Sequence, residues 1–176
     1  MKMKSSCTRE NDAGRIVSVR PPDAYVLRRA THQDAAGIWR LISTVLSDFG
    51  IVANQETTDR DLADIEAHYA DRGGIFFVLL DARTVIGTVA LRRESARVGE
   101  LCRMYLAEEY RGQGLGRRLF HHALAEAHRR GFQEIFLKTA SVLTTAISLY
   151  ERAGFRPAPN QAAGGNCDRA MRMRLD

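Results

Sequence analysis

Residues 101–131 constrain the fold of this chain most, because they read as a strand, a glycine-rich turn and a helix in direct succession. Residues 101–106 form an apolar run of the length typical of a buried strand. After a short polar turn come three closely spaced glycines, Gly112, Gly114 and Gly116. Beyond them, apolar residues recur at helical spacing, at Leu115, Leu119, Phe120, Ala123, Leu124 and Ala127. Gly131 is suited to the left-handed backbone conformation in which many helices end.

The glycine-rich turn has the physical properties of an anion site. Glycines let the backbone approach a ligand closely and adopt positive φ. The first amides of a helix have no partner inside the helix and point outward together, and the helix dipole adds roughly half a positive charge there. Arg111, Arg117 and Arg118 add full charges. We therefore expect the turn to bind a phosphate or a pyrophosphate.

Three known phosphate loops can be compared with this turn. A dinucleotide fingerprint that starts at Gly112 needs its third glycine at the position of Arg117. The P-loop string G-x-x-x-x-G-K-[ST] does not occur in the sequence. The third pattern, Arg111-x-x-Gly114-x-Gly116 after a strand, is present. A tight strand-to-helix turn without a ligand is the remaining alternative.

Length and composition predict a single domain at residues 23–176, preceded by a polar N-terminal extension at residues 1–22. This extension is expected to be flexible or to form a short capping strand. No apolar run approaches the roughly 20 residues of a membrane span, and the N-terminus lacks the apolar centre of a signal peptide. We therefore expect a cytoplasmic protein without a membrane partner.

Charge and cysteine usage exclude several classes of site. Most of the net charge of +5 lies in residues 1–22, and no basic face with interleaved aromatics is evident, which disfavours a nucleic-acid partner. The three cysteines are scattered and include no Cys-x-x-Cys pair, so we expect neither a disulfide framework nor a metal. Cys102 is expected to be a buried, inert thiol. We expect surface positions rather than metal ligation for three histidines, His121, His122 and His128.

Periodicity along the rest of the chain predicts an α/β fold with a mixed sheet. Strands are expected at residues 25–29, 75–80, 85–91, 98–106, 134–138 and 171–175, and helices at residues 31–49, 58–72, 115–130 and 142–153. Thr31 and Asp34 have the spacing of a capping box, and Thr58 is the expected cap of the second helix. Residues 158–168 are expected to be a mobile loop. The element order β-α-α-β-β-β-α-β-α-β-β places helices on both faces of the sheet.

Three strings in this order resemble the GCN5-related N-acetyltransferase (GNAT) superfamily, over residues 24–175. The first is residues 27–31 followed by Asp34, which is similar to the family's opening strand and helix cap. The second is residues 100–106 with residues 111–116, which resembles the acetyl-CoA signature. The third is residues 146–155, which is similar to the closing helix motif.

The resemblance implies that acetyl-CoA is the co-substrate and that an acetyl group is transferred to an amine. In such proteins the strand before the turn carries a bulge that binds the pantetheine arm, and the following helix start binds the pyrophosphate. The positions carried over are Met104, Tyr105, Leu106, Arg111, Gly112, Gln113, Gly114, Leu115, Gly116 and Arg117. Oriented N–H groups at a developing oxyanion are often a large catalytic contribution.

The resemblance also implies two catalytic residues. A lysine-like amine with a pKa of about 10.4 must lose a proton before it attacks, and Glu100 matches the glutamate base of the histone acetyltransferase branch. The alternative for Glu100 is a solvated carboxylate at a strand start. Tyr150 matches the tyrosine that protonates the leaving thiolate in many members. Its alternative is a packed aromatic on a helix face.

The chain departs from the family pattern at two positions. Leu143 stands where many relatives have a cofactor-contacting asparagine, so either the hydroxyl of Ser141 or Thr144 substitutes for it or the contact is absent. Lys138 stands where the N-terminal acetyltransferase branch has a glutamate base. In this family the first helix-helix connection lines the acceptor groove, and three acidic residues flank it here, Asp48, Glu56 and Asp59. They either attract a cationic amine or lie at solvated helix ends.

We therefore predict an N-acetyltransferase in which a small-molecule or peptide amine attacks acetyl-CoA directly in a ternary complex. The alternative is a non-catalytic relative that binds or senses acyl-CoA. A nucleic-acid-binding accessory protein is a third class, and its affinity would depend strongly on salt. The sequence leaves open the identity of the acceptor, the acyl group and whether the chain forms a homodimer.

Overall fold

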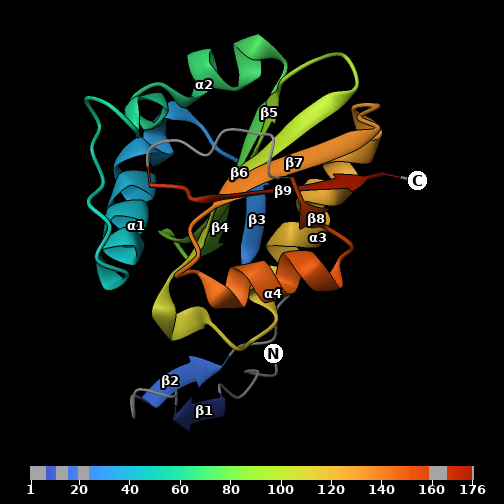
Figure 1. Ribbon diagram of the computed structural model, residues 1–176. Helices are drawn as coiled ribbons and strands as arrows, with labels where there is room; N and C mark the ends of the chain where they lie inside the picture. The colour runs from blue at the N-terminus through green and yellow to red at the C-terminus, as the bar shows by residue number, and fades with distance from the viewer. Residues whose placement is uncertain (1–6, 11–15, 20–23, 159–165, 176) are drawn as a thin grey trace.

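A computed structural model describes residues 7–10, 16–19, 24–158 and 166–175, and its core is a seven-stranded mixed sheet (Figure 1). The strand order is β3-β4-β5-β6-β7-β9-β8. The strands are β3 (Val26–Arg29), β4 (Ile75–Asp81), β5 (Thr84–Arg93), β6 (Val98–Leu106), β7 (Glu134–Thr139), β8 (Arg156–Pro157) and β9 (Arg169–Arg174). β6 and β7 run parallel, and every other neighbouring pair is antiparallel.

Helices cover both faces of this sheet (Figure 1). They are α1 (Ala35–Asp48), α2 (Ile65–His68), α3 (Leu115–Arg129) and α4 (Thr144–Arg152). One core cluster joins α3 and α4 to one face, while the other joins α1 and α2 to the opposite face. β4 is buried on both faces, with Phe77 and Leu79 in the first cluster and Phe76 and Val78 in the second. The predicted fold class and element order from residue 26 onward are confirmed.

The described parts of residues 1–22 form an antiparallel hairpin, β1 (Cys7–Glu10) with β2 (Ile16–Val19). This hairpin is a separate two-stranded sheet and does not pair with the main one. The expectation for residues 1–22 was a flexible extension or a short capping strand, and the described residues hold two short strands that pair with each other. Most of the predicted loop at residues 158–168 lies outside the described residues, and so does the remainder of residues 1–22.

The helix predicted from Thr58 onward is wrong, because the chain there is broken into three short pieces. They are 3₁₀ turns at Arg60–Leu62 and Ala70–Arg72, with α2 between them. Asp64 restarts the helix, since its side chain accepts the N–H of Ala67 at 3.0 Å. Asp59 and Asp61 turn their side chains inward and are buried, which a continuous amphipathic helix would not permit. Thr58 is consequently not a helix cap.

The first helix begins with the predicted capping interaction. The Asp34 carboxylate accepts the backbone N–H of Thr31 at 2.8 Å and its hydroxyl at 3.1 Å. Arg28 donates two hydrogen bonds to the same carboxylate, at 2.7 and 2.8 Å. A 3₁₀ turn at His32–Asp34 precedes α1, so the regular helix starts later than predicted.

His122 is not the surface residue that the sequence analysis expects. Its ring packs edge-on against Phe77, with 4.4 Å between the ring centroids, and it is half-buried. Within the described part of the chain its buried Nε2 has no hydrogen-bond partner, and burial lowers the pKa of His122. His121 and His128 are exposed, as predicted.

No helix among the described residues is long and apolar enough to span a bilayer.

Replacing Gly74 by alanine is expected to destabilise the protein. A Cβ on Gly74 would lie 2.5 Å from the carbonyl oxygen of Leu91 and 3.1 Å from that of Tyr69. Both are backbone atoms, so a strand or a turn must move, which costs about 1–3 kcal/mol in chemical denaturation. Gly116→Ala is the control, because its Cβ meets nothing closer than Leu106 Cδ2 at 4.0 Å. Equal destabilisation of the two variants would contradict the prediction.

Candidate functional site

β6 has two strand neighbours over its first half and only one over its second half. It pairs with β5 as far as Leu106, but it pairs with β7 only from Val98 to Leu101. Within the described chain, residues 102–106 therefore have no strand partner on the β7 side. Unpaired backbone N–H and C=O groups need other partners, so this edge of β6 is available to a ligand with polar groups of its own.

A β-bulge interrupts β6 at the point where it leaves β7. The register between β5 and β6 shifts between Thr88 and Ala90, so that Arg103 and Met104 together face Val89. Arg103 has a φ of 52°, in the left-handed region, and its carbonyl accepts the Thr88 hydroxyl at 2.8 Å. The bulge implied by the family resemblance is thus present, and it begins one residue before Met104.

A cleft of about 370 Å³ adjoins this part of β6. Four of the predicted site residues line it together: Glu100, Met104, Tyr105 and Tyr150. Other residues of β6 and residues of α1, β5, β7 and α4 also line it, together with the connection after α1, the turn before α4 and the segment before β9. Residues that are far apart in the chain, on β6 and α4, therefore meet at one cleft, as the resemblance predicts.

Glu100 is a buried carboxylate, with 6% of the residue exposed. Arg92 lies opposite it on β5 and donates Nη1 to Glu100 Oε2 at 3.0 Å. The other oxygen, Oε1, has no hydrogen-bond partner among the described residues. Burial raises the pKa of Glu100, and the positive charges of Arg92 and Lys138 only partly oppose that rise. The solvated carboxylate considered as an alternative is therefore wrong.

Tyr150 combines a packed ring with a hydroxyl at the cleft. Its ring lies 5.9 Å from each of the rings of Phe120 and Phe155, measured between centroids. The hydroxyl donates to the sulfur of Met104 at 3.8 Å, which joins α4 to the bulge of β6. Burial raises the pKa of Tyr150 well above its usual value, so the hydroxyl keeps its proton at neutral pH.

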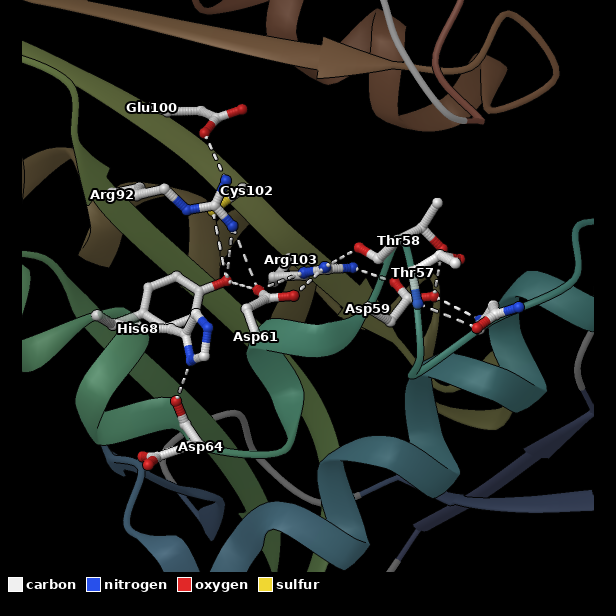
Figure 2. Close-up of polar contacts among 12 residues, drawn as sticks. Thr57, Thr58, Asp59, Asp61, Asp64, His68, Arg92, Glu100, Cys102 and Arg103 are labelled. Atoms are coloured by element: carbon white, nitrogen blue, oxygen red, sulfur yellow. Dashed lines mark hydrogen bonds and ion pairs between the residues drawn. The ribbon is translucent and has the colours of Figure 1, made fainter.

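A buried network of alternating charges connects the cleft to the α1–α2 connection (Figure 2). From Glu100 it runs through Arg92 to Asp61, whose Oδ2 accepts Arg92 Nη2 at 3.2 Å. Arg103 binds Asp61 through Nη2 and Nε, and it binds Asp59 through Nη1 at 2.5 Å. Burial acts to raise the pKa of Asp61, but the hydrogen bonds and charge of Arg103 outweigh it, so this pKa lies below its usual value.

Sequence reasoning missed most of this network. Asp59 is not at a solvated helix end, because it lines the cleft, is 2% exposed and is paired with Arg103. One signal could have indicated it, since Arg103 is a charge inside an apolar strand and buried charges require partners. Asp48 and Glu56 are exposed. Asp48 lies 3.8 Å from Arg111.

The glycine-rich turn presents backbone more than side chains. Gly112 and Gly114 have φ values of 72° and 79°, and α3 begins directly after Gly114. A Cβ on Gly114 would meet nothing within 4 Å, so the space beside the helix start is open. A second cleft, of about 590 Å³, lies here and is lined by Gly114, Arg117, Arg118 and His121, among others. An anion at this helix start would meet amides and cationic side chains.

Three of the side chains predicted to bind cofactor are used by the fold itself. Arg111 donates Nε to the Leu106 carbonyl at 3.2 Å, and its guanidinium lies 5.7 Å from the centre of the Phe49 ring. Gln113 donates to the Glu109 carbonyl at 3.1 Å. Leu115 is fully buried in the core. These side chains therefore contribute to the fold, although that of Arg111 is still 36% exposed.

Neither hydroxyl considered as a substitute for the family asparagine, that of Ser141 or that of Thr144, is part of the cleft lining. Leu143 lines the cleft itself. The Ser141 hydroxyl donates to Asp168 at 2.6 Å, so it is engaged in the fold, and Thr144 is exposed at the start of α4. Among the described residues, no group of three or more His, Cys, Asp or Glu side chains is arranged to hold a metal ion.

Comparisons with known proteins agree with this geometry. The model of the Acetyltransferase (GNAT) family matches residues 38–155. The uncharacterized N-acetyltransferase YjgM of Escherichia coli is 32% identical over 139 residues, covering 76% of this chain and 83% of that one. N-acetylaspartate synthetase of Danio rerio is 36% identical over 98 residues, but this match spans only 54% of this chain and 35% of the relative.

A solved structure extends the likeness to the fold and to a bound cofactor. The structure of YncA from Salmonella typhimurium was solved with its cofactor acetyl-CoA. It superposes with a TM-score of 0.67 at 25% identity, and the match covers 86% of this chain and 94% of that one.

Replacing Arg103 by methionine is expected to destabilise the protein strongly. Asp59 and Asp61 would stay buried without their main cation, which typically costs about 3–5 kcal/mol of unfolding free energy. Arg129→Met is the control, because that side chain is 59% exposed and its pair with Glu126 is worth less than about 1 kcal/mol. Urea denaturation measures both. An unchanged unfolding midpoint for Arg103→Met would show that the network does not stabilise the fold.

Proposed function

The chain belongs to the Acetyltransferase (GNAT) family and is an acyltransferase, and from this premise we propose that it transfers an acetyl group from acetyl-CoA to a primary amine. The observation that carries the proposal is the meeting of three features at one cleft. They are the buried carboxylate of Glu100, the protonated hydroxyl of Tyr150 and the unpaired edge of β6.

Acetyl-CoA suits the two halves of the site. Its phosphates require amides and cations, which the start of α3 and Arg117 supply. Its pantetheine arm carries amide groups, which match the backbone of β6 at Met104, Tyr105 and Leu106, where β6 has no strand partner on the β7 side. The acetyl-CoA found in YncA supports this assignment for a related fold.

Glu100 is the proposed general base. An amine of lysine-like pKa, about 10.4, is mostly protonated at neutral pH and must lose a proton before it attacks. Glu100 would take that proton directly or through one water, using the oxygen that Arg92 does not contact. The raised pKa of Glu100 suits this role, because a base is most effective when its pKa approaches the working pH.

Tyr150 is the proposed general acid. The amine nitrogen attacks the thioester carbonyl carbon, a C–N bond forms and the C–S bond breaks. The thiolate takes its proton from Tyr150, and the second proton lost by the nitrogen balances the one that Tyr150 gives up. A covalent enzyme intermediate is not required. Burial raises the pKa of Cys102 to about 12, which keeps that thiol protonated and poorly nucleophilic.

Glu100→Gln and Tyr150→Phe are each expected to lower kcat by about 10²–10⁴-fold, the usual contribution of a general acid or base. Release of free thiol from acetyl-CoA in the presence of an amine panel measures turnover. Calorimetry should give an unchanged acetyl-CoA affinity for both variants. Glu151→Gln, an exposed carboxylate beside Tyr150, is the matched control and should keep full turnover.

Two results would contradict this proposal. Full turnover of Glu100→Gln and Tyr150→Phe would remove their assigned roles. A wild-type protein that binds acetyl-CoA but acetylates no amine in the panel would instead be an acyl-CoA-binding relative without catalysis.

Gly114→Val is expected to weaken acetyl-CoA binding by tenfold or more, because a β-branched residue is strained at this positive φ and the amides of the turn would be reoriented. Gly131→Val is the matched control, since Gly131 has a φ of 75° and equally open surroundings at the other end of α3. The two variants should lose similar stability in thermal melts. Equal acetyl-CoA affinity in calorimetry would place the phosphates elsewhere.

A further inference from the structure

The ionic groups that line the cleft are paired with one exception. Asp59 is bound by Arg103, and Glu100 is bound by Arg92. Both arginines also bind Asp61 behind the lining. Lys138, on β7, also lines the cleft, and it makes no ion pair or hydrogen bond with any described residue. Residues 159–165, which are not described, contain no acidic side chain that could pair with it.

The sheet register places Lys138 beside the proposed base. Glu100 pairs with Phe136 in the parallel β6–β7 ladder, and Lys138 follows two residues later on β7. Side chains two residues apart on a strand point to the same face, so Glu100 and Lys138 project from one face of the sheet. The Lys138 ammonium lies 5.9 Å from the centre of the Phe136 ring, and the residue is exposed.

We propose that Lys138 binds a carboxylate of the acceptor, so that the acceptor class of this acetyltransferase is amines that carry a carboxylate, amino acids above all. This inference rests on the proposed function. An amino acid would place its amine toward Glu100 and its carboxylate toward Lys138. Pairing of a free ammonium with a carboxylate is charge-assisted and is stronger than a neutral hydrogen bond.

The same charges disfavour a polycationic acceptor. A diamine or polyamine needs a second carboxylate for its far ammonium, and both carboxylates of the described lining already bind arginine. That far ammonium would instead meet Lys138, and like charges repel. The matching relative named N-acetylaspartate synthetase has a product name that contains an amino acid with a side-chain carboxylate, which agrees with the charge argument.

The test compares kcat/KM for matched amines with saturating acetyl-CoA. L-aspartate, L-asparagine and the α-amide of L-aspartate differ in one carboxylate at a time, and cadaverine represents the cationic class. We expect at least one carboxylate-bearing amine to be preferred over its amide and over cadaverine by tenfold or more. A thermal shift of the CoA-bound protein by the same amines gives a second readout that does not depend on turnover.

Variants of Lys138 distinguish an effect of this side chain from an effect of the overall positive charge of the protein. Lys138→Gln should lower kcat/KM for the preferred carboxylate substrate by about tenfold or more relative to its amide, the value of a hydrogen bond to a charged group. The lost charge also acts on Glu100, but that effect is the same for both substrates. Lys138→Arg should restore most of the preference. Arg172→Gln is the control, because it removes one positive charge from an exposed residue outside the cleft lining.

Each outcome decides the inference. Preference for cadaverine over all three carboxylate-bearing amines would overturn the acceptor class while leaving the transferase function intact. An equal loss for carboxylate and amide substrates in Lys138→Gln would overturn the role of Lys138. Acetyl-CoA binding without acetylation of any amine would overturn the proposed function itself, and the acceptor class with it.

Discussion

The site depends on the parting of β6 from β7 after Leu101. Up to that residue β6 is an ordinary central strand with its backbone paired on both sides. Beyond it, the bulge at Arg103 and Met104 redirects the strand, and one edge is left without a strand partner in the described chain. A strand edge inside a domain is usually covered, because unpaired peptide groups lose their bonds to water. Here the edge borders a cleft, which leaves those groups accessible.

The buried charges have a structural consequence at the same place. Arg103 adopts a left-handed φ, and its guanidinium spans to Asp59 and Asp61 on the connection after α1. That connection is only loosely helical, and these ion pairs add to its own short-range hydrogen bonds, such as that from the Asp59 N–H to the Asn54 carbonyl at 2.8 Å. Because Arg92 joins Asp61 to Glu100, the side chain of Glu100 is oriented by the same network that fixes the connection.

The sequence predicted most of the fold because the signals for it are local. Apolar periodicity predicted each strand of the main sheet except the short β8, and the glycine spacing predicted the turn before α3. The helix expected at Thr58 was wrong because Asp59 and Asp61 bind an arginine more than forty positions away, which no local pattern reports. The roles assigned to Glu100 and Tyr150 from the family resemblance imply that the two residues lie at one site. Periodicity alone shows which face of a helix or strand a residue lies on, but not which residue of another element it meets. Lys138 was noticed as a departure, but its lack of a partner needed the structure.

The glycine-rich turn has a role in the fold and, as proposed, a second role in binding the cofactor. The side chains of Arg111, Gln113 and Leu115 serve the fold, whereas Gly114 leaves the space beside the start of α3 open. Substitutions of these side chains would therefore register first as changes in folding, even though the segment looks like a recognition motif. Selection for a folded chain would then preserve this stretch even in a descendant that no longer used the cofactor. A retained signature at this turn is thus weaker evidence of retained activity than a retained Glu100 would be.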